Sequence, residues 1–524
     1  MALWFRIVAI AAALTLSWVG EAQAKWLRAE TAHFNLYSNG REAELRDFAT
    51  KLEVFDEALR YFHPAPVDAH LTKLDIYLVN DEDELDRIWR RSSGVAGFYS
   101  ADSEGTFAVA RRDGGDFAQT VLFHEYTHHF MLRNYSYPYP RWLVEGWAEY
   151  FGSSRVYPDR IDVGLPNGER GESIGSWSVS TRDLFSKRSS ELPNGSVYVF
   201  YARAWLLTHY LMSDDNRRRE LNSYMRLVGE GGDTIASLEK ALGYDMVTLD
   251  RKLREYLSHR VPYTSIKRKN VTIPMTVTAL SPAADDILLE HVRLVSGVSS
   301  KDAQGALKNI QFRAKRHPDD RLARLTLARA YIMLGDPADA EPILQHYVAD
   351  QKDTEALYLM GLRYARMAEK ELGYDQRKAE AEQKAEKLKG QEDKDPPLPE
   401  INPDPLTRAR AVAWYAKARP WFVKANHADP ESYEVLFAFA QSRAFDADYP
   451  TDGTMETLAS AYQLAPQVGT ITYTSAKALI ARGRQPEAIN LLRLLANDPH
   501  GGSLAKSAKA LLESLNAATP EEGS

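Results

Sequence analysis

The chain of 524 residues is too long for a single hydrophobic core, so about two to four domains are expected. Hydrophobic residues make up 44% and charged residues 26% of it, as in soluble globular proteins, and a formal charge of −7 does not favour nucleic acid as a partner. The sequence has no cysteine, which excludes disulfides, thiol catalysis and thiolate ligands, so any metal must be held by histidine and carboxylate.

The first 24 residues have the layout of a cleavable export signal of the bacterial type. Arg6 supplies a positive charge, an apolar run follows at 7–19, and alanines stand three residues and one residue before a cut after Ala24. The apolar run is short for a membrane span. We therefore predict an exported protein, periplasmic or secreted, with no stable membrane span after the signal is removed. The alternative is an uncleaved anchor.

Residues 25–260 are predicted to form an α+β domain with a mixed sheet. Residues 33–37 and 74–79 have the composition of strands, and apolar residues recur at helical spacing between them, at 42–62. Further helices are expected near 117–133, 141–152, 198–213 and 235–258.

A β-hairpin is expected at 95–111, with its turn at Asp102-Ser103-Glu104-Gly105. Its second strand, residues 105–111, is interpreted as an edge strand. An extended peptide can pair with such a strand through main-chain hydrogen bonds.

The central motif is His124-Glu125-Tyr126-Thr127-His128. Two histidines four residues apart lie on one face of a helix, so both imidazoles can reach the same metal ion. Glu125 is placed to reach a water bound to that metal. Asp116 is expected to cap the start of this helix. The pentapeptide alone is suggestive, and the segment that follows strengthens it.

The next predicted helix offers a third ligand. A catalytic zinc takes three protein ligands and keeps one position open for water, so two histidines leave one ligand missing. Glu145 and Glu149 are four residues apart and share a helix face. Spacing alone leaves both as candidates. Gly146 beside them would allow close helix packing.

His-Glu-x-x-His, followed some twenty residues later by Glu-Gly-x-Ala, resembles the gluzincin metallopeptidases, which include the thermolysin-like enzymes and related aminopeptidases. The resemblance covers residues 25–260, with its specific motifs at 117–205. It implies a gluzincin-like catalytic domain with one Zn²⁺. The implied roles are metal ligands for His124, His128 and Glu145, a general base for Glu125, and orientation of a ligand histidine for Glu149.

A later segment, Phe200-Tyr201-Ala202-Arg203-Ala204, is similar to the aminopeptidase helix whose tyrosine stabilises the oxyanion. Tyr201 is the matching position, with Tyr198 as a rival and core packing as the alternative for both. Exopeptidases of this clan carry a Gly-x-Met-Glu-Asn segment that binds the substrate amino terminus. This chain lacks it, which favours an endopeptidase over an aminopeptidase.

The C-terminal half has a different sequence pattern. Residues 261–284 are rich in proline and β-prone and are interpreted as a linker. Over 285–516, Ala, Leu and Tyr recur at helical spacing, and three prolines stand 36 and 33 residues apart, near the tetratricopeptide period of about 34. We predict an all-α tetratricopeptide-like solenoid that recruits a protein substrate or partner. Its charged insert, 369–404, should be an exposed helix ending in a loop, and 517–524 a disordered tail.

Taken together, these features predict an exported zinc-dependent peptidase. The alternative is a non-catalytic envelope scaffold that retains a structural metal site, although a structural zinc has no use for a base such as Glu125. Gly171-Glu172-Ser173-Ile174-Gly175 matches the nucleophile pattern of serine hydrolases, but that pattern functions only at a strand-to-helix elbow.

Overall fold

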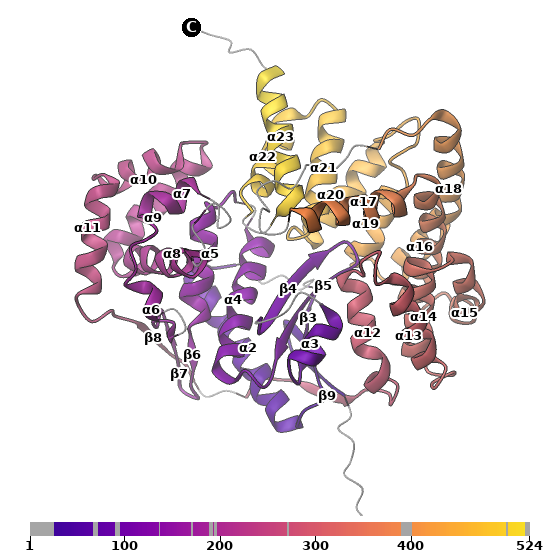
Figure 1. The fold of residues 1–524 in the computed structure, drawn as a ribbon, viewed down its shortest axis with the longest axis horizontal. Coiled ribbons are helices and arrows are strands. Elements are labelled where there is room, and N and C mark those ends of the chain that lie inside the picture. The colour runs from indigo at the N-terminus through magenta and orange to yellow at the C-terminus, as the bar shows by residue number, and fades with distance from the viewer. Residues whose placement is uncertain are drawn as a thin grey trace, which may run out of the picture.

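The computed structural model describes residues 26–65, 72–89, 95–135, 137–168, 171–187, 192, 196–269, 272–388, 401–498 and 501–518. The predicted export signal lies outside these residues, as do 519–524 of the predicted tail and 389–400 of the charged insert. The described chain is an α+β structure in which a mixed sheet and its helices are followed by a C-terminal helical repeat region (Figure 1).

The main sheet has six strands in the order β4-β5-β3-β2-β1-β9. β2 and β5 run parallel to β3, and the other neighbours are antiparallel. The strands are β1 (Leu27–Glu30), β2 (Phe34–Ser38), β3 (Leu74–Val79), β4 (Gly97–Asp102), β5 (Gly105–Arg111) and β9 (Thr276–Ala279).

The interpretation of residues 105–111 as an edge strand is wrong. β5 pairs with β4 on one side and with β3 on the other, and β4 ends the sheet. The continuous run of buried residues from Phe107 to Ala110 explains this position, because a strand covered on both faces has no polar alternation. The hairpin and its turn lie where they were predicted.

Helices cover both faces of the sheet. One face packs on α2 (Glu42–Phe62) and α4 (Gly115–Asn134), where Phe55 stacks on Phe123 with ring centroids 4.0 Å apart. The opposite face, which includes Tyr77 and Phe107, packs on α12 (Ala284–Ser296), the first helix after the sheet closes. α3 (Glu82–Ile88) joins this second layer.

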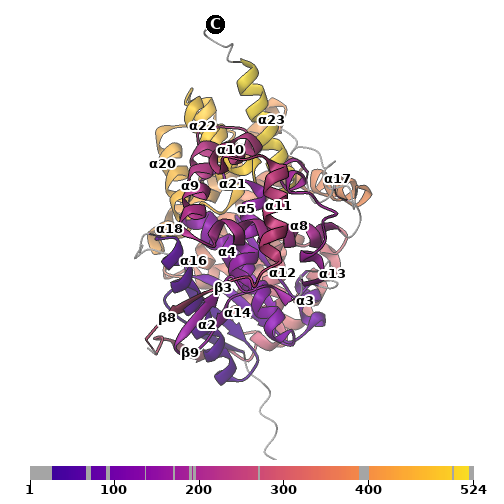
Figure 2. The same ribbon diagram turned by 90° about the vertical axis from the view of Figure 1, so that its left-hand side faces the viewer.

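A helical layer follows α4 in the chain. It contains α5 (Arg141–Gly152), α6 (Gly171–Ile174), α7 (Thr181–Ser186), α8 (Ser196–Met212), α9 (Asp215–Gly229), α10 (Thr234–Leu242) and α11 (Met246–Leu257). Of these, α8, α9, α10 and α11 lie on the side that faces the viewer in Figure 2. The single helix expected at 235–258 is two helices. Gly243 adopts φ +74° and ends α10, and the Asp245 side chain accepts a hydrogen bond from the Thr248 amide to begin α11.

The segment expected to link the two regions supplies a strand to each of two sheets. β8 (Thr264–Lys267) pairs with β7 (Arg160–Val163), which also pairs with β6 (Arg155–Val156). β9 then pairs with β1 in the main sheet. The chain therefore returns to the main sheet before the repeats begin.

The repeat region continues from α12 as pairs of packed helices. Its elements are α13 (Ala303–Ala314), α14 (Arg321–Leu334), the 3₁₀ helix Pro337–Ala340, α15 (Glu341–Tyr347), α16 (Thr354–Glu371), α17 (Tyr374–Lys387), α18 (Pro405–Ala428), α19 (Tyr433–Gln441), α20 (Asp452–Leu464), α21 (Gly469–Ala481), α22 (Gln485–Ala496) and α23 (Gly502–Ala518). None of the described residues of α17, within the charged insert, is buried.

The repeats form an arc from α12 beside the sheet to α20–α23 above the end of α4 (Figure 1). Near the far end of the arc, the Arg133 guanidinium donates to the Leu464 carbonyl, and Asn497 donates to the Pro138 carbonyl at 3.3 Å. Both ends of the arc thus contact the α+β part. No helix in the described parts of the chain is both long and apolar enough to span a bilayer.

Candidate metal centre

Two consecutive helices bring the predicted ligands together. His124 and His128 are one turn apart on α4, and Glu145 lies on α5, which packs against α4. α4 begins at Gly115 with Gly114 as its cap and no side-chain capping bond, so the capping role expected for Asp116 is wrong. Asp116 instead places a negative charge in the first turn, where it interacts favourably with the positive end of the helix dipole.

Three donor atoms converge at this site. The Nε2 atoms of His124 and His128 are 3.1 Å apart, and each lies 3.5 Å from Oε2 of Glu145. A tetrahedral zinc with bonds of about 2.0–2.1 Å separates its ligand atoms by about 3.3 Å, so this triangle has the dimensions of three zinc ligands. Within the described ranges, this is the one group of three or more such side chains whose donor atoms approach to within 4.8 Å of one another.

The ligand side chains are shielded from water and lie in a negative environment. His128 and Glu145 are buried, and His124 is half-buried. Burial alone would lower the pKa of the His124 imidazole, but the hydrogen bond to Glu145 and the charges of neighbouring carboxylates outweigh it and raise the pKa. The position between these side chains therefore favours a cation.

Glu149 contacts His124 on the side of the ring that faces away from the other two ligands. Its Oε1 lies 3.5 Å from Nδ1 of His124, on the ring nitrogen that does not face Glu145. The other carboxylate oxygen of Glu149 accepts a hydrogen bond from Asn167 Nδ2 at 3.2 Å. Asn167 was not found from the sequence, because it lies in a loop without a motif. This chain of contacts fixes the orientation of the His124 ring.

The two residues with expected catalytic roles lie next to the ligands. Glu125 directly follows His124 on α4, is half-buried, and its charge helps to raise the pKa of the His124 imidazole. The ring of Tyr201 on α8 lies edge-on to His124, with centroids 6.2 Å apart. Tyr198, its rival, is 61% exposed and lies in the first turn of the same helix. The structure thus brings Tyr201 to His124.

Two glycines of α5 allow the close helix packing that builds the site. A Cβ at Gly146 would lie 2.7 Å from the Ala204 carbonyl oxygen on α8. A Cβ at Gly152 would lie 3.2 Å from the His124 amide nitrogen on α4. Gly146 was expected to permit close packing, and Gly152, at the contact with α4 itself, was not anticipated. α5 is therefore held between the two helices that carry His124 and Tyr201.

Other aromatic residues of α4 and α5 belong to the core, and the serine motif does not form a nucleophile elbow. His129 is buried, its Nδ1 is hydrogen-bonded to the Tyr99 hydroxyl at 2.9 Å, and burial lowers its pKa to about 3. Trp142 donates to the Tyr224 hydroxyl at 3.1 Å within the core. Ser173 lies in a four-residue helix, and the described residues before it, 164–168, form no strand, so the elbow required of a serine nucleophile is absent from this part.

Comparison with known proteins identifies part of the repeat region. Residues 298–362 match the family model for the tetratricopeptide repeat, which spans α13, α14, α15 and the start of α16. The predicted tetratricopeptide-like repeats are confirmed there, and repeats of this kind bind other proteins. No curated protein matched the chain. The resemblance to metallopeptidases stays a prediction.

Proposed function

We propose that the chain is an exported zinc-dependent peptidase that binds one Zn²⁺ through His124, His128 and Glu145. The observation that carries the proposal is the triangle of donor atoms, with sides of 3.1, 3.5 and 3.5 Å. Two neutral imidazoles and one carboxylate form a ligand set typical of catalytic zinc, which keeps a further position for water.

The remaining residues fit hydrolysis of a peptide bond. When bound, zinc activates water and polarises a carbonyl group. Glu125 is the general base: its carboxylate accepts the proton of the attacking water and delivers it to the leaving nitrogen. The Tyr201 hydroxyl donates a hydrogen bond to the negative charge that develops on the substrate oxygen. Glu149 keeps the His124 ring in place through Nδ1.

The proposed substrate is an internal segment of a protein. The sequence lacks the segment by which exopeptidases of the resembled clan bind an amino terminus. β4, the last strand of the sheet, lies against α4 through the contact of Tyr99 with His129. An extended segment aligned with β4 would run beside the helix that carries His124 and His128.

A non-catalytic protein-binding scaffold is the second candidate, and the tetratricopeptide match is the observation that favours it. In that case the metal site serves only to hold α4 and α5 together. The presence of Glu125 and Tyr201 beside the ligands supports the peptidase instead, because neither side chain is needed for a structural zinc.

The test compares the chain from Lys25 onward with its Glu125→Gln and His128→Ala variants. Zinc content and cleavage of casein are measured for each. The control is Glu230→Gln, which removes an exposed carboxylate at the C-terminal cap of α9. We expect about one zinc in the parent, the Glu125→Gln variant and the control, and cleavage only by the parent and the control.

The outcomes separate the two candidates. Zinc binding without cleavage by the parent favours the scaffold. A parent that binds no zinc, or a His128→Ala variant that binds zinc as tightly as the parent, contradicts the metal site itself.

A further inference from the structure

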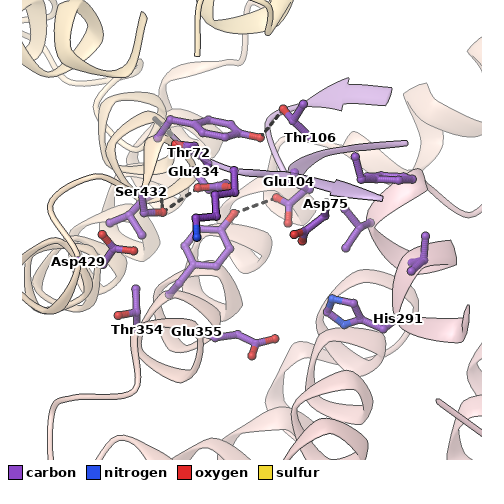
Figure 3. Close-up of a pocket in the computed structure, with 18 of the residues that line it drawn as sticks. Thr72, Asp75, Glu104, Thr106, His291, Thr354, Glu355, Asp429, Ser432 and Glu434 are labelled. Atoms are coloured by element: carbon purple, nitrogen blue, oxygen red, sulfur yellow. Dashed lines mark hydrogen bonds between the residues drawn. The ribbon is translucent and has the colours of Figure 1, made fainter. Parts of the chain in front are cut away.

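A pocket of about 360 Å³ lies between the α+β part and the repeats (Figure 3). The β4–β5 turn and β3 form one side, and α12, α14, α16 and the start of α19 form the other. Tyr77 and Phe107 belong both to the pocket wall and to the sheet face that packs on α12. His124 lies on α4, across the sheet, so this pocket is separate from the candidate metal centre.

The walls of the pocket are fixed by hydrogen bonds between the two parts of the chain. The Tyr433 hydroxyl donates to the Asp102 carbonyl at 3.0 Å, and the Tyr358 hydroxyl donates to Glu104 at 3.0 Å. Arg329 also donates to Glu104, at 2.6 Å. Both tyrosines and Arg329 are buried. The pocket is therefore preformed, and its volume falls in the range of about 300–1,000 Å³ that is usual for ligand sites.

Negative charge dominates the lining. Its acidic residues, which come from separate segments of the chain and surround the same space in Figure 3, are Asp75, Glu104, Glu355, Asp429 and Glu434. Two basic residues also line it, and each already has an acidic partner: Lys73 contacts Glu30 at 2.7 Å, and Arg329 contacts Glu104. Burial lowers the pKa of His291 to about 4, so this residue adds no positive charge at neutral pH.

Three of these carboxylates have hydrogen bonds but no basic side chain within 4.0 Å among the described residues. Asp75 accepts from Asn35, Glu434 from Ser432, and Asp429 from a backbone amide. Burial raises the pKa of Asp75 to about 6 and raises that of Glu434, and the weaker opposing effects of the Arg28 and Arg329 charges do not cancel it. A cation that enters the pocket would make the close contact with a positive charge that neither carboxylate has among the described residues.

The arrangement fits a basic side chain better than a metal ion. In the described part of the chain, no set of three pocket residues brings its donor atoms together as the metal centre does. The carboxylates are instead spread around a pocket that also contains Tyr77, Phe107 and Tyr358, and aromatic faces attract ammonium and guanidinium groups. Arg329 and Tyr358 also fall within the tetratricopeptide match, the part of the chain expected to bind proteins.

We propose that this pocket binds a lysine or arginine side chain presented by an extended segment of a partner protein. The side chain enters between the β4–β5 turn and α16, and its charge is met by Asp75, Glu434 and Asp429. This site is independent of peptide hydrolysis, and its occupancy by a partner requires no metal.

The test uses the chain from Lys25 onward, alone and with Glu125→Gln, so that cleavage is not mistaken for binding. Fluorescence anisotropy at about 50 mM salt follows a dye-labelled peptide, Ser-Gly-Lys-Gly-Lys-Gly-Ser, and its counterpart with glutamine at both lysine positions. The pocket variants are Glu434→Gln and Asp75→Asn, which are nearly isosteric. Glu456→Gln, an exposed carboxylate on α20 outside the pocket, removes the same charge as a control.

We expect the lysine peptide to bind at least about tenfold more tightly than the glutamine peptide, and each pocket variant to weaken its binding by about tenfold. The Glu456→Gln control should change it by less than about twofold. Thermal melts check that each variant is folded, and either pocket variant is sufficient for the test. Equal binding of the two peptides, or an equal loss in the control, overturns the proposal. Competition by Ca²⁺ that is lost in the pocket variants shows a divalent-cation site and overturns it as well.

Discussion

Glu149 Oε1 lies 3.5 Å from Nδ1 of His124, while Nε2 of the same ring lies 3.5 Å from Glu145. The ring is therefore held between two carboxylates on successive turns of α5. Because Nδ1 faces Glu149, the proton of a neutral His124 is favoured on Nδ1, which leaves the lone pair of Nε2 directed towards His128 and Glu145.

Replacing Glu149 with alanine should weaken zinc binding by about 10- to 100-fold, because the His124 ring loses the acceptor that orients it. Zinc affinity is measured by competition with a chromophoric chelator, on metal-free protein shown to be folded by circular dichroism. Glu230→Ala, which removes an exposed carboxylate, serves as the control. An unchanged affinity for the Glu149→Ala variant would show that Glu149 does not position the ligand.

Asn167→Leu tests the hydrogen bond that Asn167 donates to Glu149. Asn167 donates to Glu149 at 3.2 Å, so its loss should lower zinc affinity in the same direction but by less than Glu149→Ala, by about threefold to tenfold. The double variant should bind zinc about as weakly as Glu149→Ala alone, since both residues act through one carboxylate. If the two substitutions lower zinc affinity additively in this double-mutant cycle, Asn167 does not act through the Glu149 carboxylate.

Gly146→Ala should destabilise the fold by about 1–3 kcal/mol, because the added methyl group would lie 2.7 Å from the Ala204 carbonyl on α8. Urea unfolding measures the free energy. Gly305→Ala on α13 is the matched control, since its Cβ would meet nothing within 4 Å and should be neutral or stabilising by up to about 1 kcal/mol. Equal free energies of unfolding for the two variants would show that α5 and α8 can move apart to accept the methyl group without loss of stability.

Local signals predicted the elements that carry the site. Apolar spacing predicted helices at 42–62 and near 141–152, which are α2 and α5, and the four-residue spacing of His124 and His128 placed both rings on one face. These features are encoded within a few turns of helix. The convergence of Glu145 with the histidines was inferred through a resemblance, because residues on separate helices meet only through tertiary packing.

Features that depend on distant contacts were missed for the same reason. β9 pairs with β1 across some 250 residues, and nothing near Thr276 indicates that partner. Asn167 meets Glu149 through a loop with no regular pattern. The apolar run at 107–110 did contain the signal of an interior strand, and it was read instead as an edge.

The pair His33–Glu53 should make stability depend on pH above about 6.5, the ordinary pKa of histidine. The hydrogen bond from His33 Nδ1 to Glu53, at 2.8 Å, raises the pKa of His33 against the opposing effect of burial. The folded state thus holds the proton more tightly than the unfolded chain, where histidine has a pKa of about 6.5. The stabilisation is complete below that value and is lost as pH rises through the higher folded pKa.

His33→Gln tests this dependence. The stability of the parent relative to the variant, from urea unfolding, should be greatest near pH 5.5 and decrease by about pH 8.5. His259→Gln, at an exposed histidine, should show no comparable trend. A parent-to-variant difference that stays constant over this range would mean that the ion pair does not contribute to folding.

Glu104 joins the hairpin turn to the repeats, since it accepts hydrogen bonds from Arg329 at 2.6 Å and from the Tyr358 hydroxyl at 3.0 Å. Glu104→Ala should destabilise the protein by up to about 3 kcal/mol, because it leaves the buried Arg329 guanidinium without its carboxylate. Glu230→Ala breaks an exposed pair with Arg226 and should cost less than about 1 kcal/mol.

Urea unfolding gives both values, and limited proteolysis should cut the Glu104→Ala variant faster between the α+β part and the repeats. If both variants lose the same stability, the contact between the hairpin turn and α14 does not hold the two parts together.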